Sequence, residues 1–483
     1  MLNFFRKNAA KIGFILVVFF IGTMFSGVLF LRGTKGAEKA YKQRNLNSSE
    51  IAFIGNLPLN QGKYQSFLNM SLGMLANAKD IQRTYPEFMG ILQYNAFNQA
   101  LNYTVFLEYA NEKNIKVSSK ELKTALEDVY TKYKLKNKKE LKDLLKKNNY
   151  SYKQFLRDFK DDLKVQKYIN GLTLSIMVSD KDVEDKYTSV KIAHILLKTN
   201  EENDEAKDQD VLKGAQSIVE KINNGLSFSQ AAKQYTDDPG TKEKNGVLGW
   251  INIGDTVEEF EYEAFNLQPG EMSKPVKTLY GYHIIKVLDK KVKKKPADFD
   301  LEKEKQALLS MKRARALQNS IQAYLLSHKL EISDEMIRAY DATQKGDFQT
   351  AINAYQALSS KQPNSPAPTY LLAQIYLLLG NTQEAKKVLQ KAELLGDINK
   401  SISIPMVNVE LGKIYLKEKD FKNKNKQFEK ATILAGSNIT LLKQLKVIFE
   451  SLKEKRRVKV LNKKIEALEK KETAKTVKKT GKN

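Results

Sequence analysis

A 34-residue repeat in the C-terminal third restricts the fold of this chain more than any other feature of its sequence. Gly346 and Gly380 are 34 residues apart, and so are Ala351 and Ala385. The segments around them, AYDATQKGDFQTAINAYQAL and TYLLAQIYLLLGNTQEAKKVLQKA, both have the apolar spacing of helices. A unit of this length cannot bury its apolar face alone, so neighbouring units stack. We therefore expect an α-solenoid whose concave groove binds a peptide or protein partner.

Further units follow this pair. The segment ELGKIYLKEKDFKNKNKQFEKA forms a third unit, in which Asp420 stands 39 residues after Asn381, and the insertion GDINKSISIPM accounts for the extra length. Residues 440–470 read as a degenerate fourth unit or a capping helix. The 34-residue period is that of the tetratricopeptide repeat (TPR). We therefore predict TPR-like repeats over 333–470 and a disordered basic tail over 471–483.

The N-terminus carries an uninterrupted apolar run. Twenty uncharged residues, Ile12 to Leu31, lie between Lys11 and Arg32. A helix of that length is about 30 Å long, which is the thickness of the hydrocarbon core of a bilayer. The alternative, a cleavable signal peptide, has a shorter apolar segment and a small-residue cleavage site. We predict a transmembrane anchor at 12–31, whose orientation the flanking positive charges leave open.

Composition argues against several classes of function. The chain has 81 Lys and Arg against 56 Asp and Glu, a net charge of +25, but the lysines are spread along it, usually beside acidic residues. Because it has no arginine-rich stripe and no recognisable nucleic-acid-binding module, we predict no nucleic-acid partner. The chain has no cysteine, which excludes disulfides, thiolate nucleophiles and cysteine-ligated metals. No metal and no small-molecule cofactor are expected.

Residues 50–188 have helical patterns. Three helix starts are marked by a serine that is followed three residues later by an acid or a glutamine. These pairs are Ser118/Glu121, Ser151/Gln154 and Ser179/Asp182. Before them, IAFIGNLPLN places short apolar runs on both sides of Gly55-Asn56, which indicates a hairpin. The residues alone predict a helical packing domain here.

Two of the three histidines lie in predicted buried strands. His194 is in VKIAHILLK and His283 is in GYHIIKVL, and both segments are rich in β-branched and apolar residues. Taken alone, each histidine is typical of a hydrogen-bonded core residue. The segments between them read as two helices, a Gly-bounded strand, a short helix and a turn before a final strand pair. We predict a four-stranded antiparallel sheet with helices packed against it.

The region that contains these histidines resembles the parvulin family of peptidyl-prolyl isomerases along its whole length. The shared segments are AHILLK, GLSFSQAAKQYTDD, LGW, EEFEYEAFNLQPGEMS and GYHIIKV. Upstream, EIAFIGNLPLNQGKYQSFL, LEYANEKNIKVSSKELKTAL and VSDKDVEDKYTSV are similar to the N-terminal domain of the SurA/PpiD/PrsA group. These are extracytoplasmic chaperones that carry parvulin domains. The predicted anchor makes the chain most similar to PpiD.

The resemblance implies a site. In the family, two facing histidines lie beneath a proline pocket and are hydrogen-bonded to a Cys or Asp and to a Thr. The matching catalytic residues are His194, Asp238, Thr278 and His283, and the matching substrate-binding residues are Leu248, Thr256 and Phe260. The chain departs from the family at Thr256, where the family has Met, and at NGVLG, 245–249, where Gly-Gly-Asp-Leu-Gly is common. These departures bear on the efficiency of catalysis and not on the fold.

The chemistry of proline isomerisation agrees with such a site. Rotation about an X-Pro bond takes tens to hundreds of seconds without a catalyst because amide resonance opposes it. The resonance form is dipolar, so an apolar pocket disfavours it relative to the twisted amide. Neutral histidines offer one donor and one acceptor each, which suits a fixed polar floor. The loop after the first strand, KTNEENDEAKDQD, is acidic and repels phosphate, so we expect unphosphorylated substrates.

The predicted fold class is multidomain α+β. It comprises one transmembrane helix, a helical SurA-like chaperone domain, a parvulin domain with a four-stranded antiparallel sheet and a C-terminal α-solenoid of TPR-like repeats. The predicted boundaries are a cytoplasmic N-terminus at 1–11, the anchor at 12–31, the chaperone domain at 50–188, the parvulin domain at 189–290, a helix returning to the chaperone domain at 297–330, the repeats at 333–470 and the tail at 471–483.

The predicted function is that of a membrane-anchored, extracytoplasmic folding factor. It is expected in the inner membrane as a single-pass protein with its body on the periplasmic side. There it would hold unfolded or newly translocated client proteins and isomerise X-Pro bonds. Two alternatives stay open. One is an ATP-independent holdase whose parvulin domain binds without catalysing, and the other is a scaffold whose repeats recruit partners.

Overall fold

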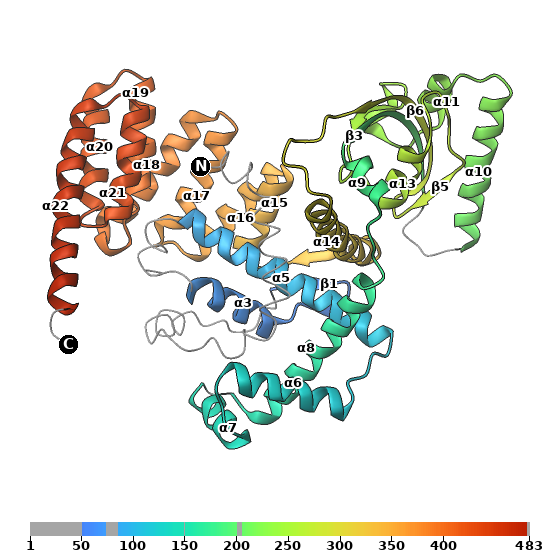
Figure 1. The fold of residues 1–483 in the computed structure, drawn as a ribbon. Coiled ribbons are helices and arrows are strands. Elements are labelled where there is room, and N and C mark those ends of the chain that lie inside the picture. The colour runs from blue at the N-terminus through green and yellow to red at the C-terminus, as the bar shows by residue number, and fades with distance from the viewer. Residues whose placement is uncertain (1–50, 74–85, 149, 200–204, 481–483) are drawn as a thin grey trace. The chain divides into compact units, whose positions relative to one another are not determined.

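The computed structural model describes residues 51–73, 86–148, 150–199 and 205–480 of the chain (Figure 1). The chain divides into two compact units. The first contains the described residues of Val105–Lys329, and the second contains those before and after this segment. The second unit is therefore discontinuous in sequence, and each unit is described by itself below.

Four strands form an antiparallel sheet in the first unit, in the order β4-β3-β6-β5. The central strands β3 (Thr188–Lys198) and β6 (Gly281–Val292) pair along their whole length. The edge strands are the shorter β4 (Val247–Ile251) and β5 (Val276–Thr278). Strand β3 is buried over most of its length and β6 over its N-terminal half, and both are rich in valine, isoleucine and leucine, which pack well on a pleated surface.

Helices cover both faces of this sheet. Helices α10 (Glu205–Asn223) and α11 (Phe228–Tyr235) pack on one face, where their apolar side chains share a core with Ile195. Helix α13 (Glu258–Asn266) packs on the other face, in a core that includes Ile192. Because side chains alternate along a strand, each central strand feeds both cores. The result is a closed α+β domain with a separate apolar layer on each side of the sheet.

Helices that precede and follow this domain in sequence complete the first unit. They are the C-terminal part of α5 (Pro86–Glu112), α6 (Ser119–Lys132), α7 (Lys138–Lys147), α8 (Tyr152–Thr173), α9 (Asp180–Lys186) and α14 (Leu301–Ser327). The serines at 118 and 179 form complete capping boxes at the starts of α6 and α9, and Ser151 caps α8. These caps satisfy N–H groups that a helix start leaves without partners.

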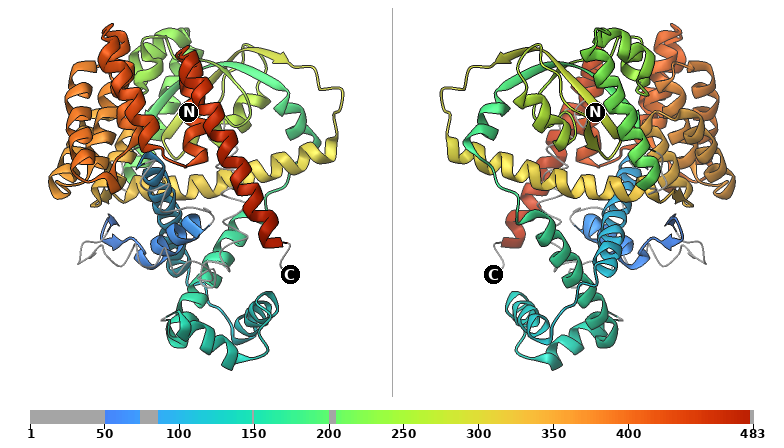
Figure 2. Two further views of the ribbon diagram at one scale, coloured as in Figure 1. Left: turned by 90° about the vertical axis from the view of Figure 1, so that its left-hand side faces the viewer. Right: turned by 90° about the vertical axis from the view of Figure 1, so that its right-hand side faces the viewer.

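Helix α14 is one continuous helix that follows the sheet domain (Figure 2). It packs against α8 through an aromatic cluster in which Tyr109 stacks on Tyr168, with ring centroids 5.4 Å apart, and meets the edge of Tyr324 at 5.2 Å. The hydroxyl groups of Tyr168 and Ser320 are 2.9 Å apart. Through these contacts the chain returns from the sheet domain to the helices that precede it.

A second, small sheet opens the other unit. Strands β1 (Ala52–Ile54) and β2 (Leu57–Pro58) form the hairpin that the sequence predicts, turning at Gly55 with a φ of +58°. Strand β7 (Leu330–Ile332) pairs with the free edge of β1, so the order is β2-β1-β7. Helix α3 (Gln61–Gly73) follows the hairpin.

Eight helices form the C-terminal solenoid of the second unit (Figure 2). The residue that ends the first helix of each successive pair has a left-handed backbone, and these residues are Gly346, Gly380, Lys419 and Lys453. The last two are again 34 residues apart, so the final pair is a fourth repeat unit. The glycine spacing in the sequence does not reveal the third and fourth units, because lysine takes the place of glycine at this left-handed position. The helices are α15 (Glu335–Lys345), α16 (Phe348–Lys361), α17 (Pro366–Leu378), α18 (Thr382–Ile398), α19 (Pro405–Lys417), α20 (Phe421–Leu434), α21 (Ile439–Ser451) and α22 (Lys455–Thr480).

Helix α22 corrects one predicted boundary. It continues to Thr480, through most of the segment that we predicted to be a disordered tail at 471–483. The segment KETAKTVKKT contains three threonines and a valine beside four lysines, one alanine and one glutamate. Lysine, alanine and glutamate are good helix formers, and a helix that has already started adds further residues without the cost of nucleation.

The predicted membrane span also needs correction. No helix in the described part of the chain is both long and apolar enough to cross a bilayer. The 27-residue helices α5 and α14 are long enough, but polar or charged residues recur along them. The predicted anchor at 12–31 lies outside the described residues. The fold class is corrected to a multidomain, mostly helical one, and neither the predicted inner-membrane location with a periplasmic body nor a membrane partner is supported.

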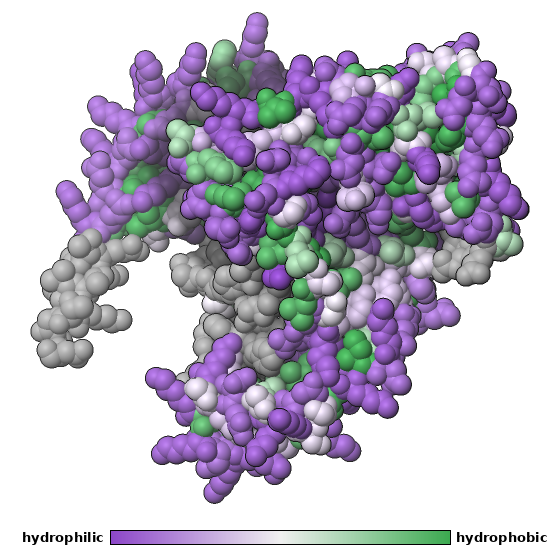
Figure 3. Space-filling model, turned by 45° about the vertical axis from the view of Figure 1, so that its right-hand side comes forward, coloured by the Kyte–Doolittle hydropathy of each residue, from purple (hydrophilic) through white to green (hydrophobic). Residues whose placement is uncertain are grey.

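The positive charge of the chain is distributed over its surface. The face shown in Figure 3 is mainly hydrophilic, with hydrophobic patches that are small and separated. Many lysines pair with acids, as in Lys167–Glu121, Lys181–Asp185 and Lys386–Glu418. Exposed pairs of this kind contribute little to stability but keep the surface well solvated.

Candidate active site

His194 of β3 and His283 of β6 lie side by side in the centre of the sheet. In the strand register His194 faces Ile285 and His283 faces Leu196. Residues two apart in a strand share a face, so both histidines lie on the face covered by α13, as Ile285 does. Both side chains are buried. Their rings are nearly parallel, with centroids 5.5 Å apart and the two Nδ1 atoms 3.3 Å apart.

A chain of hydrogen bonds runs through the two rings. At one end Nε2 of His194 lies 2.9 Å from Oδ2 of Asp238, and at the other Nε2 of His283 lies 2.9 Å from Oγ1 of Thr278. The carboxylate accepts a hydrogen bond from the Nε2–H of His194, which leaves Nδ1 of that ring as an acceptor for the Nδ1–H of His283. His283 then accepts the hydroxyl proton of Thr278, whose oxygen accepts the N–H of Tyr280 at 3.1 Å. One set of neutral tautomers satisfies every group.

The electrostatics keep both rings neutral. Burial lowers the pKa of His194, and hydrogen bonding and attraction to Asp238 oppose this only in part. Burial, followed by repulsion from His194, lowers the pKa of His283 to about 3. Burial alone would raise the pKa of Asp238, but hydrogen bonds from Thr241, the N–H of Gly240 and His194 outweigh it and lower that pKa. Near neutral pH the site is therefore two imidazoles and one carboxylate.

Local sequence explains the position of Asp238. It is the N-cap of the short helix α12 (Pro239–Lys242), where its side chain accepts the N–H of Gly240 at 3.0 Å and proline occupies the first helical position. Two residues before Asp238, the hydroxyl oxygen of Thr236 accepts the backbone N–H of Leu196 on β3 at 3.0 Å. The segment TDDPG thus delivers the carboxylate to the side of His194.

The structure adds Thr241, which the sequence analysis did not identify. Its buried hydroxyl lies 2.6 Å from Oδ2 of Asp238 and 3.2 Å from Nε2 of His194. A hydroxyl-bearing residue three positions after an N-cap aspartate was the only available signal, and it is a common arrangement in helix starts. Thr241 therefore belongs to the polar cluster, where it orients the carboxylate.

Phe260 of α13 covers the two histidines. Its ring meets that of His194 edge-on at 5.7 Å and 81°, and that of His283 at 5.2 Å and 86°. Its side chain is buried in the α13-side core. The structure thus brings five of the predicted residues together: an apolar ring above a polar floor.

The other two predicted wall residues lie differently. Leu248 is on the edge strand β4, and 43% of it is exposed. Thr256 is in the loop before α13, where its backbone N–H donates to Oε1 of Glu261 at 2.9 Å and its hydroxyl lies 3.4 Å from the same atom. Neither residue has a direct polar or ring contact with the histidines in the described structure.

The departure NGVLG is structurally conservative. Asn245 and Gly246 both have left-handed backbones, with φ of +55° and +81°. Asparagine tolerates this conformation better than other residues with a side chain, so it can replace a glycine here. Gly246 is needed, because a Cβ there would lie 2.6 Å from the carbonyl oxygen of His194. Val247, in place of Asp, packs against the α10–α11 core.

The described residues contain no cluster of three or more His, Asp or Glu side chains that could hold a metal ion. Within the candidate site the only charged partner of the histidines is Asp238, and its oxygens are already engaged. The arrangement suits binding of an apolar group above neutral rings better than metal or nucleophilic chemistry.

Three regions of the chain match known families. Residues 1–169 match the SurA-like N-terminal domain, residues 173–291 match the PPIC-type PPIase domain, and residues 342–396 match the tetratricopeptide repeat. The PPIC-type match contains every residue of the candidate site.

Named relatives are foldases. Foldase protein PrsA 3 of Bacillus cereus is 38% identical over 210 residues, which are 43% of this chain and 66% of the relative. Foldase protein PrsA of a Geobacillus species is 31% identical over 278 residues, 54% of this chain and 88% of the relative. A crystal structure of PrsA from Bacillus anthracis shares 29% identity, covers 47% of this chain and 93% of that chain, and has a TM-score of 0.24, so no argument rests on that superposition.

Proposed function

The chain belongs to the family of PrsA foldases, and from this premise we propose that the cluster around His194 and His283 isomerises X-Pro bonds of client proteins. The predicted resemblance to the SurA/PpiD/PrsA group is confirmed, and so are the parvulin type of the isomerase domain and the presence of TPR repeats. The chain spans 66% of the length of the first of its curated relatives. Its own activity, substrates and partners are therefore proposals.

The observation that carries the proposal is the apolar ring of Phe260 above two neutral histidines. Proline's ring is apolar, and burying it against Phe260 binds the substrate. A neutral, water-poor pocket favours the twisted amide over the planar, dipolar one, because the planar form gains more from solvation. No nucleophile is needed, since the barrier is rotational.

The polar floor has a positioning role in this mechanism. His194, Asp238, Thr278 and His283 would hold the two rings in one orientation under the substrate, with Thr241 fixing the carboxylate. The neutral state matters, because a charged imidazolium would attract water and stabilise the planar amide. Leu248 and Thr256 would complete the wall, as the family match implies.

Two further parts of the proposal concern the client. We infer that it is unphosphorylated, because acidic residues follow β3: Asp208 on α10 already binds Lys277 and the hydroxyl of Tyr282, at 2.9 Å. A phosphate would meet the carboxylate rather than a free lysine. The SurA-like domain and the TPR repeats support a second activity, ATP-independent holding of unfolded chains.

The test is a proline-exchange assay with the full chain. NMR exchange spectroscopy on an X-Pro peptide should show catalysis, with no gain when a phosphoserine precedes the proline. Phe260→Ala should raise KM roughly tenfold or more, because it removes apolar wall. Tyr262→Ala is the matched control, since Tyr262 is an exposed aromatic residue on the same helix.

A folded chain that leaves the exchange rate at its uncatalysed value would overturn the isomerase proposal. If that same chain still binds the peptide through Phe260, the domain binds without catalysing, which is the alternative that the sequence left open. Suppression of client aggregation by the full chain without ATP tests the holding activity separately.

A further inference from the structure

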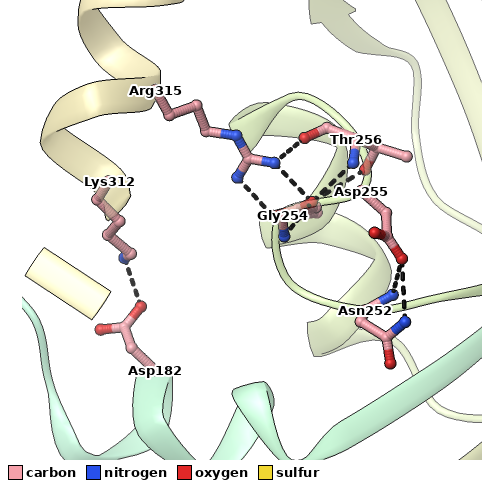
Figure 4. A network of polar contacts seen from close by, with 8 residues as sticks. Asp182, Asn252, Gly254, Asp255, Thr256, Lys312 and Arg315 are labelled. Carbon is pink, nitrogen blue, oxygen red and sulfur yellow. Dashed lines mark hydrogen bonds and ion pairs between the residues drawn. The ribbon is translucent and has the colours of Figure 1, made fainter. Parts of the chain in front are cut away.

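Helix α14 lies beyond the residues that match the isomerase family, which end at 291, yet it binds the helix that carries Phe260. The contact is a buried ion pair between Arg315 of α14 and Glu261 of α13 (Figure 4). Nη1 and Nη2 of Arg315 donate to Oε2 and Oε1 of Glu261 at 2.7 and 2.8 Å. Two parallel bonds hold a carboxylate in one orientation, so the pair fixes α13 against α14.

The same carboxylate holds the loop that leads into α13. Oε1 of Glu261 accepts the backbone N–H groups of Gly254 and Thr256, each at 2.9 Å. Arg315 also donates to the carbonyl oxygen of Thr256. Only 3% of Glu261 and 14% of the Arg315 side chain are exposed, so water screens these bonds little. The loop and the start of α13 therefore depend on one buried cluster that includes a residue of α14.

The other end of the loop is attached to the sheet. Asp255 accepts two hydrogen bonds from Asn252, from its backbone N–H at 2.7 Å and from its side-chain amide at 3.0 Å (Figure 4). The side chain of Asn252 in turn lies 2.8 Å from the hydroxyl of Ser189 on β3. Since β3 fixes the first half of the loop, the cluster at Glu261 decides the position of the second half.

Thr256 connects this cluster to the candidate active site. It stands where the parvulin family has a methionine of the pocket wall. In this chain its N–H and its carbonyl group are both bound in the cluster, and its hydroxyl lies close to Glu261. Four residues later, Phe260 meets both histidine rings. Thr256 and Phe260 thus frame a segment of the site that α14 contacts, through Arg315.

We propose that Arg315 is a positioning residue of the isomerase: by binding Glu261 and Thr256 it holds Phe260 over His194 and His283. The inference rests on the proposed isomerase function and extends the working unit to α14, outside the family match. A fragment that ends at 292 keeps Glu261 but loses its partner.

Helix α14 has an independent attachment that supplies a control. One turn before Arg315, Lys312 binds Asp182 of α9 at 2.6 Å (Figure 4). Lys312→Met weakens the attachment of α14 to α9 and leaves the cluster at Glu261 intact. Its kcat/KM should stay within about twofold of the wild type, as expected for a partly exposed pair.

The test uses the full chain and the X-Pro peptide assay. Arg315→Met should lower kcat/KM roughly tenfold, because a small displacement of a wall residue is costly in a preorganised site. Arg315→Lys should recover part of the loss, since lysine provides the charge but not the two-bond fork. The double variant Glu261→Gln/Arg315→Met buries no unpaired charge, so it folds even where Arg315→Met does not. It should remain less active than Lys312→Met.

A second readout reports position directly. The chain has only three histidines, so ¹³C labelling of their rings yields three signals. Arg315→Met should shift the signals of His194 and His283, because Phe260 lies edge-on to both, and should leave His328 on α14's C-terminal end unchanged. Such a selective shift does not follow from a general loss of stability.

The outcomes separate the two proposals. If Arg315→Met and the double variant both match Lys312→Met in kcat/KM and in histidine shifts, Arg315 does not position the site. If the wild type lacks isomerase activity but the two histidine signals still shift in Arg315→Met, the proposed function fails while the positioning by Arg315 stands.

Discussion

Two glutamates with shielded carboxylates, the buried Glu261 and the half-buried Glu87, have different surroundings in the two units. Glu261 in the first unit accepts two backbone N–H groups and a bidentate arginine. Glu87, near the start of α5 in the second unit, has an Oε2 atom with no hydrogen-bond partner among the described residues. Its electrostatic neighbours are Tyr370 and Glu410, which provide no positive charge.

The two carboxylates differ in the number of hydrogen-bond donors that surround them. A buried carboxylate is stable as an anion only when donors replace the water that it loses. Glu261 has them, so it can serve as a fixed anchor. Burial, aided by repulsion from Glu410, raises the pKa of Glu87 to about 7. Glu87 therefore titrates near neutral pH within the second unit.

Removing the donor from the anchored glutamate should have the largest effect. Arg315→Met leaves Glu261 buried without its counterion, and we expect a loss of about 3–5 kcal/mol in the stability of the first unit. Hydrogen exchange of the α13 amides measures this locally. Glu261→Gln/Arg315→Met should recover a large part of the loss. If the single variant is as stable as the wild type, Glu261 is not an anchor.

Replacing Glu87 by a neutral residue should stabilise the chain at high pH, whereas Arg315→Met destabilises it. Its pKa is raised from 4.5 to about 7 in the folded state, so the folded chain binds that proton more tightly than the unfolded chain does. This stabilisation is complete below pH 4.5 and is lost as the pH rises through 7. Glu87→Gln should therefore stabilise the second unit by up to about 3 kcal/mol at pH 8 and have little effect at pH 4.

Thermal unfolding at the two pH values checks this prediction. Glu429→Gln is the matched control, because Glu429 is an exposed glutamate on α20 of the same unit. Equal stabilisation of Glu87→Gln at both pH values would mean that its carboxylate does not titrate in this range.

Removing a hydrogen-bond partner of His283 should cause a loss of stability smaller than that of Arg315→Met. Thr278→Val keeps the shape of the side chain but leaves Nε2 of His283 and the N–H of Tyr280 without their partner. We expect a loss of about 1–3 kcal/mol and a reduced isomerase rate. Thr131→Val is the control, since the hydroxyl of Thr131 bonds only the preceding turn of an exposed helix. Similar losses in both variants would argue against a linked floor.

Thr241 should give the smallest effect. Thr241→Val removes one of three donors to Asp238, and the N–H of Gly240 and the ring of His194 remain. We expect a loss of about 1 kcal/mol at neutral pH. Because Thr241 helps to lower the pKa of Asp238, the loss of stability on acidification should be smaller in the variant and should end at a higher pH. If the free energy of unfolding falls with acid in the same way in the variant and the wild type, Thr241 does not act on this carboxylate.

Much of the site was predictable because its parts belong to short, recognisable segments. His194 and His283 stand in strand patterns, and the family resemblance joins them to each other and to Asp238. Thr241 and the pairing of Glu261 with Arg315 were not predictable. The two charged residues are 54 positions apart and lie in ordinary helical patterns that resemble many solvated ones.

The sequence by itself determined the local structure: the capping boxes at Ser118 and Ser179 and the hairpin at Gly55 depend on neighbours within one or two turns. The tertiary structure alone decided which charges are buried and which residue supplies their donors. It placed Arg315 beside Glu261, and among the described residues it gave Oε2 of Glu87 no such partner. The physical reason is that the free energy of a buried charge depends on the groups packed around it, and their distance along the chain carries no information about that packing.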